Sequence, residues 1–229
     1  MTSSGLEVNP TDDKWAFRSL FNIARNHYVT GRVCLVNGMI ESGCLLAQQS
    51  IESYLKGIAH STNLSGRELY YFKKEDPSQT GKIRIWGHNL THLVQALLGD
   101  NSALGVFLSD KQMASFLEKL TESYEPVRYG EASPSAVFEI LVQEFDRAVQ
   151  ILDGIYHEKM GIKAETRLYV PSSLRTDFLR NNKVFPQSKI TAFPMANLAM
   201  GVDLTPLEKK FNFDKGKVVQ QASGRSDKT

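Results

Sequence analysis

Apolar residues recur at intervals of three or four through most of the first 157 residues, and this spacing predicts helices. The clearest case is the segment 32–60. Its apolar face consists of Val36, Ile40, Cys44, Ala47, Ile51, Tyr54 and Ile58. We expect this segment to be a long helix around which the rest of the chain packs.

The same segment carries two further faces. One has small residues at every seventh position, namely Gly43, Ser50 and Gly57, which allow another helix to approach closely. The other is polar, with Gln48, Glu52 and Lys56 one turn apart, and Glu52 precedes Lys56 by four residues in the favourable order. The long helix is therefore predicted to have a core face, a contact face and a polar edge.

Five helices are expected between residues 11 and 157, at 11–30, 32–60, 88–99, 110–125 and 133–157. Gly31 would break the first helix from the second, and Pro126 would end the fourth. Ser109 or Asp110 is expected to cap the fourth helix, and Ser133 with Pro134 is expected to open the fifth. Short connections between neighbours predict an all-α, up-and-down bundle over residues 11–160, with no sheet in it and a loop or short helix at 65–77.

The chain changes in character after residue 160. A short strand at 166–170 and short helices at 173–181 and 205–213 are expected, and 214–229 has the composition of a disordered tail. Large apolar residues in the segment 161–213 need burial although the segment has little regular structure. We therefore expect 161–213 to form an irregular extension that wraps its own bundle or a second subunit.

Charge is distributed unevenly between these two parts. Residues 1–156 hold 14 basic and 18 acidic residues, a net charge of −4, whereas residues 157–229 hold 13 and 7, a net charge of +6. A basic extension on an acidic bundle is suited to nucleic acid, to a partner protein, or to the bundle itself.

Several classes of protein are disfavoured by missing patterns. The first residues resemble no signal peptide and the chain has no run of about 18 apolar residues, so we expect a cytoplasmic protein without a membrane contact. The common nucleotide, hydrolase and zinc motifs are missing, and no cofactor is expected. His88 and His92 have metal-ligand spacing but no third ligand at helical spacing. Cys34 and Cys44, expected on one helix, are too far apart for a disulfide.

Three sequence patterns together resemble the HEPN family of small helical bundles. The first is an A-x-Q-x-x-E-x-x-L-K-like helix at 47–56, the second is G-H-x-L-x-x-L at 87–93, and the third is an Arg-Tyr junction at Arg128 and Tyr129. The resemblance covers residues 15–157. It implies a dimeric helical bundle with a polar groove for nucleotide or RNA, in a defence or toxin–antitoxin-like context.

Many HEPN proteins are metal-independent ribonucleases with an R-x(4–6)-H motif. In that motif histidine is the general base on the ribose 2′-hydroxyl and arginine stabilises the phosphorane. No arginine and later histidine in this chain have that spacing, and the positions five to seven residues after Arg128 are Ser133, Pro134 and Ser135. The sequence therefore favours a binding or regulatory module over a nuclease, unless a histidine distant in sequence completes the site.

The groove is expected to be lined by Gln48, Glu52, Lys56, His88, Arg128 and Tyr129. Arg128 is suited to a phosphate because its guanidinium makes paired hydrogen bonds, and Tyr129 is suited to stacking on a base. The alternative is structural: Arg128 pairs with Glu52 or Glu131, and Tyr129 fills the gap between helices. A third hypothesis is a pure interaction module whose bundle forms a homodimer and whose basic extension holds a partner protein from the same system.

Overall fold

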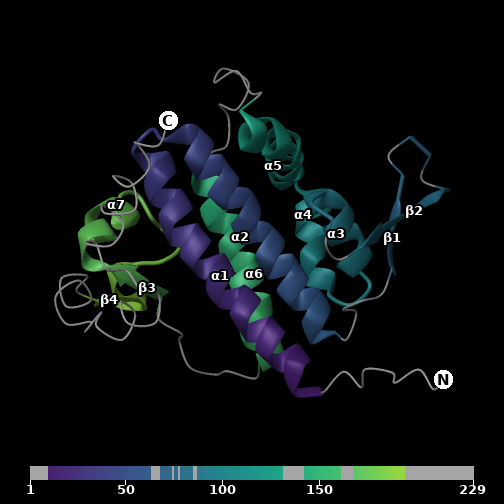
Figure 1. Ribbon diagram of the computed structural model, residues 1–229, viewed down its shortest axis with the longest axis horizontal. Helices are drawn as coiled ribbons and strands as arrows, with labels where there is room; N and C mark the ends of the chain where they lie inside the picture. Colours follow the sequence, from purple (N-terminus) through teal and green to yellow (C-terminus); the bar gives the residue numbers. More distant parts are fainter. Residues whose placement is uncertain are drawn as a thin grey trace, which may run out of the picture.

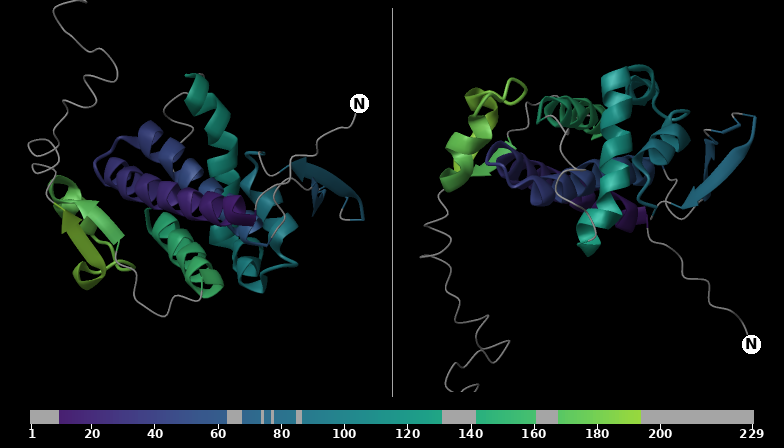
Figure 2. Two further views of the ribbon diagram at one scale, coloured as in Figure 1. Left: turned by 60° about the horizontal axis from the view of Figure 1, so that its bottom comes forward. Right: turned by 90° about the horizontal axis from the view of Figure 1, so that it is seen from above.

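The long helices form the centre of the molecule. The computed structural model describes residues 10–62, 68–73, 75–76, 78–84, 87–130, 142–160 and 168–193. Helix α1 (Pro10–Val36) and helix α2 (Ile40–Ser61) pack side by side as a helical hairpin, and α6 (Val142–Met160) packs against both (Figure 1). Helix α5 (Lys111–Tyr129) crosses this layer steeply, as Figure 2 shows. The fold is mainly helical, as the sequence predicts.

Glycines mark where α1 and α2 cross. Gly31, which was expected to end the first helix, lies inside α1, and a Cβ atom there would lie 3.0 Å from the Cβ of Leu46. The turn comes later, at Gly38, whose φ of 78° is in the left-handed region. The predicted break at Gly31 is therefore wrong, because this glycine allows close helix packing and does not end the helix. Cys34 and Cys44 consequently lie on different helices, both buried and both free.

The small face of α2 is occupied by α1 of the same chain. A Cβ atom at Gly43 would lie 2.6 Å from side-chain atoms of Leu35, and the Ser50 hydroxyl donates to the carbonyl oxygen of Ala24 at 2.8 Å. The expected close approach of another helix is thus seen, but within one chain. This face leaves no surface for self-association, so the expected homodimer, which stays a prediction, needs a different surface.

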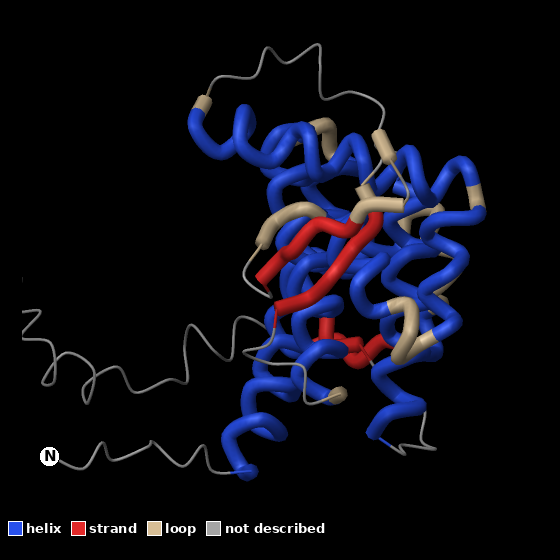
Figure 3. Tube along the Cα trace, turned by 90° about the vertical axis from the view of Figure 1, so that its right-hand side faces the viewer, coloured by secondary structure: helices blue, strands red, loops and turns tan. Residues whose placement is uncertain are grey.

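A β-hairpin interrupts the helices after α2. Strand β1 (Glu68–Phe72) pairs antiparallel with β2 (Thr80–Arg84), with Leu69 opposite Ile83. The expectation of a loop or short helix without a sheet is wrong here, because Leu69 pairs with Ile83 across the strands and is buried against the helices. Figure 3 shows the hairpin lying in front of the helices as a separate two-stranded unit.

Short helices connect the hairpin to α5. They are α3 (Leu90–Leu97), the 3₁₀ turn η1 (Ser102–Gly105) and α4 (Val106–Ser109). The expected cap of α5 is confirmed, since the Asp110 carboxylate accepts from the amides of Gln112 and Met113. The expected end at Pro126 is wrong. Pro126 removes one backbone hydrogen bond but lies only in the last turn, and Gly130 with a φ of 71° ends the helix instead.

The C-terminal segment 168–193 packs on its own bundle. It comprises β3 (Leu168–Pro171), η3 (Ser172–Leu174), α7 (Arg175–Leu179), η4 (Gln187–Lys189) and β4 (Ile190–Phe193), with β3 parallel to β4. The strand and the first short helix expected here are confirmed. The expected start of the fifth helix at Ser133, the expected helix at 205–213 and the tail lie outside the described residues.

A buried arginine holds this segment in place. The Arg32 guanidinium contacts both oxygens of Asp146 on α6, at 2.8 and 3.0 Å. It also donates to the carbonyl oxygens of Phe178 at 2.6 Å and Arg180 at 3.0 Å. The Phe178 ring packs edge-on against Tyr28 of α1, and both side chains are fully buried. Three elements distant in sequence are therefore joined through one side chain.

Candidate functional site

The polar edge of α2 meets the start of α3. Gln48 is fully buried, and its Nε2 atom donates to the carbonyl oxygen of His88 at 2.7 Å. The Glu52 carboxylate lies 3.0 and 3.1 Å from Nδ1 of His88, and it also pairs with Lys56 one turn along α2. Asn89 then caps α3 by accepting from the amide of His92, so the backbone next to His88 is fixed by the helix start.

A tyrosine of α5 extends this contact to the end of that helix. The His88 ring stacks on Tyr124 with 4.9 Å between ring centres and 29° between planes. Nη1 of Arg128 donates to the Tyr124 hydroxyl at 3.1 Å. One continuous line of side-chain contacts therefore crosses from α2 past the start of α3 to α5. We call it the polar row, and it consists of Lys56, Glu52, His88, Tyr124 and Arg128.

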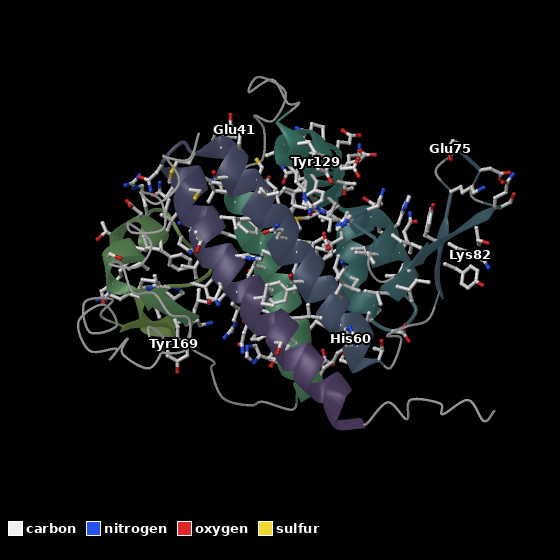
Figure 4. All side chains as sticks on the ribbon, viewed as in Figure 1. Glu41, His60, Glu75, Lys82, Tyr129 and Tyr169 are labelled. Carbon is white, nitrogen blue, oxygen red and sulfur yellow. The ribbon has the colours of Figure 1, made fainter. Side chains whose placement is uncertain are left out.

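The arginine end of the polar row is open. The guanidinium carbon of Arg128 lies 5.7 Å from the ring centre of Tyr124 and 5.6 Å from that of Tyr129. Among the described residues no carboxylate pairs with Arg128. Glu52 pairs instead with Lys56 and His88, and Glu131 lies outside the described residues. Tyr129 is 66% exposed at the end of α5 (Figure 4), so it does not fill a gap between helices.

All six residues predicted for the groove thus lie in one region. Gln48, Glu52, Lys56 and His88 are in direct contact, Arg128 joins them through Tyr124, and Tyr129 neighbours Arg128. The sequence did not predict Tyr124 as a member of this site. Its position four residues before Arg128 was the available signal, because that spacing brings the two side chains together on a helix.

The two histidines with metal-ligand spacing face different neighbours. His88 lies against Glu52, whereas His92 stacks on Tyr71 of the hairpin with 3.5 Å between ring centres. In the parts of the chain that the structure describes, no three His, Cys, Asp or Glu side chains gather where they could hold a metal ion. His92 faces a groove between β1, α3 and α5 that has a volume of about 1040 Å³.

A second polar cluster lies where α1, α2 and α6 meet. Nε and Nη2 of Arg25 each contact Asp153 at 2.9 Å, and the Tyr54 hydroxyl donates to the same carboxylate at 2.9 Å. His157 lies 3.2 Å from Asp153 and 3.3 Å from Arg25. Burial opposes ionisation of Asp153, but the hydrogen bonds from His157, Arg25 and Tyr54 outweigh it and lower its pKa. Because both oxygens of Asp153 hold Arg25, this cluster serves helix packing.

None of the helices in the described residues is long and apolar enough to cross a membrane. The chain matches no family model, no curated protein and no solved structure. The function must therefore be argued from the geometry of the sites, because a helical fold by itself implies no activity.

Proposed function

We propose that the chain is a binding module that holds the phosphate of a nucleotide or RNA at the Arg128 end of the polar row. The observation that carries this proposal is the exposure of Arg128 and its contacts. Its guanidinium is exposed, is positioned by the neutral hydroxyl of Tyr124, and has no acidic partner among the described residues. An arginine in this state keeps most of its donors available for an incoming anion.

The neighbours of Arg128 support the same ligand. Tyr129 presents an exposed ring beside the guanidinium, and base-on-aromatic stacking contributes about 1–3 kcal/mol per base. Glu52, which was expected as a possible partner of Arg128, is 8% exposed and already contacts Lys56 and His88, so its charge is compensated before a phosphate approaches. A phosphate on Arg128 with a base on Tyr129 is the arrangement that these positions favour.

The experiment measures the binding of fluorescein-labelled single-stranded RNA by fluorescence anisotropy. Arg128→Ala should weaken binding about tenfold, because it removes a charge-assisted hydrogen bond. It should also lower the slope of log affinity against log salt by about 1. Lys111→Ala is the matched control, since Lys111 is an exposed cation at the opposite end of α5. Equal losses in Arg128→Ala and Lys111→Ala, or none in either, would contradict the proposal.

A ribonuclease is the second candidate, and one observation favours it. Glu52 contacts Nδ1 of His88, which leaves Nε2 as the nitrogen that would take the proton of a ribose 2′-hydroxyl. The 2′-oxygen would attack phosphorus, the 5′-oxygen would leave, and Arg128 would stabilise the added negative charge. Cleavage of RNA in the presence of a chelator, lost in both His88→Gln and Arg128→Ala, would establish the enzyme and replace the simple binding module.

The biological setting follows from the HEPN resemblance and is part of the proposal. A dimeric regulatory module of a defence or toxin–antitoxin-like system would bind RNA at the polar row and a partner protein elsewhere. The pure interaction module remains the alternative. It predicts that RNA binding is weak and equally insensitive to Arg128→Ala and Lys111→Ala.

A further inference from the structure

The groove beside α3 is separate from the polar row. One wall is the hairpin with Tyr71 and Glu75, the floor is α3 with His92 and Gln95, and the other wall is α5 with Glu118 and Glu122. Its volume of about 1040 Å³ is just above the range for small-molecule sites, about 300–1000 Å³. His88 and Arg128 do not line it, so the proposed phosphate site does not use it.

A fixed aromatic pair joins the hairpin wall of the groove to its floor. The Tyr71 and His92 rings stack with 11° between planes. A Cβ atom at Gly81 of β2 would lie 2.4 Å from the Tyr71 ring, so only glycine allows the ring to lie across that strand. Burial of the imidazole lowers the pKa of His92, with the Glu75 carboxylate opposing the shift, so His92 is neutral near pH 7.

The charge of the groove is negative. Glu75, Glu118 and Glu122 line it together with one lysine, Lys73, and the neutral His92 adds no positive charge. A phosphate or carboxylate ligand is disfavoured here by the same charges.

Charge, not the hydrogen-bonding groups of the floor, selects the ligand, because the one acceptor without a partner is closed off from the groove. Oε1 of Gln95 is buried and has no donor among the described residues, although a buried acceptor without a partner costs about 1–3 kcal/mol. A metal ion does not fit the described residues, because no three of their acidic or histidine side chains converge on one point. The negative charge is instead spread along the groove over two walls. A long ligand with several separated positive groups matches this arrangement.

We propose that the groove between the β1–β2 hairpin, α3 and α5 binds a small organic polycation of the aliphatic polyamine class. Its ammonium groups pair with Glu75 on one wall and with Glu122 on the other. The methylene segments between the charges lie on the fixed Tyr71–His92 pair, which gives them an apolar surface.

The test measures the binding of spermidine to the full-length protein by isothermal titration calorimetry. Saturable binding at one site is expected, and it should weaken as salt is raised. Glu122→Gln and Glu75→Gln should each weaken binding about two- to fivefold, as expected for one exposed ion pair. The control is Glu125→Gln, the exposed glutamate one turn after Glu122 on α5, which does not line the groove and should bind spermidine like the unmodified chain.

A second variant tests the floor without changing charge. Gly81→Ala should displace the Tyr71 ring and weaken spermidine binding, while circular dichroism should show an unchanged helical fold because the substitution lies in β2, outside the helices. The proposal is overturned if spermidine gives no saturable binding. It is equally overturned if Glu125→Gln weakens binding as much as Glu122→Gln, because the effect would then be general attraction to an acidic surface.

Discussion

Asp153 is a buried carboxylate with three partners on three helices. Arg25 comes from α1, Tyr54 from α2 and His157 from α6 itself. Removing one member of such a network leaves the other polar groups buried without a partner, which costs more than the net contribution of the network. The cluster therefore makes the packing of α1 and α6 sensitive to the ionisation of one side chain.

The pH dependence of this contribution follows from the lowered pKa of Asp153. A carboxyl group whose pKa is lower in the folded state stabilises the fold above its unfolded pKa of about 3.9. That stabilisation is lost as the pH falls through the lower, folded pKa. We therefore expect the difference in unfolding free energy between the unmodified chain and Asp153→Asn to shrink as the pH falls below about 4.

Urea denaturation between about pH 5 and pH 2 measures this difference. Asp100→Asn is the control, because Asp100 is exposed after α3 and takes part in no network of the described residues. A difference between Asp153→Asn and the unmodified chain that stays constant over this pH range would contradict the argument.

At the scale of elements, the crossing of α1 and α2 depends on the absence of side chains. A methyl group at Gly43 would lie 2.6 Å from side-chain carbon atoms of Leu35 and 3.1 Å from the backbone nitrogen of Leu35. The two helices would therefore have to separate. We expect Gly43→Ala to destabilise the fold by about 1–3 kcal/mol, the usual cost of overpacking, despite the better helix propensity of alanine.

Gly154 on α6 provides the opposite case. A Cβ atom there would meet nothing within 4 Å, so Gly154→Ala should stabilise the protein by about 0.5–1 kcal/mol through helix propensity alone. Both free energies of unfolding can be measured by urea denaturation. If Gly43→Ala stabilises the fold as Gly154→Ala does, α1 and α2 do not cross as closely as the structure shows, and the argument is contradicted.

The same elements show how far the sequence predicts the fold. Periodic apolar positions and the Asp110 cap identified helices correctly, because these signals act within one segment. Gly31 was misleading, because the role of a glycine in close packing depends on the neighbouring helix, and Pro126 was misleading because α5 continues one turn to the Gly130 cap. The six residues predicted for a groove from spacing and from the family resemblance lie in one region, and their binding of a ligand stays a prediction. Tyr124 and the groove beside α3 required the packing of three separate elements.

The whole molecule is held together by contacts between the bundle and the C-terminal segment. Phe178 and Phe185 of that segment pack on Tyr28 of α1, at 5.6 and 5.4 Å between ring centres, and Arg32 binds two of the segment's carbonyl groups. Burial of each such aromatic side chain is worth about 1.5–3 kcal/mol. The segment is therefore part of the core, and its described residues do not form a free basic arm.

The last prediction concerns a chain that ends at residue 160. Such a chain exposes the apolar faces of α1 and α6 and leaves the buried Arg32 without its carbonyl partners, so we expect it to aggregate or lose its cooperative unfolding transition. A chain that ends at residue 193 keeps the described segment and should remain soluble and fold cooperatively. Size-exclusion chromatography and thermal unfolding compare the two. The opposite result would be a soluble, cooperatively folding chain 1–160 together with salt-sensitive RNA binding by the full-length protein only. That result would show that the extension serves nucleic acid and that the bundle folds without it.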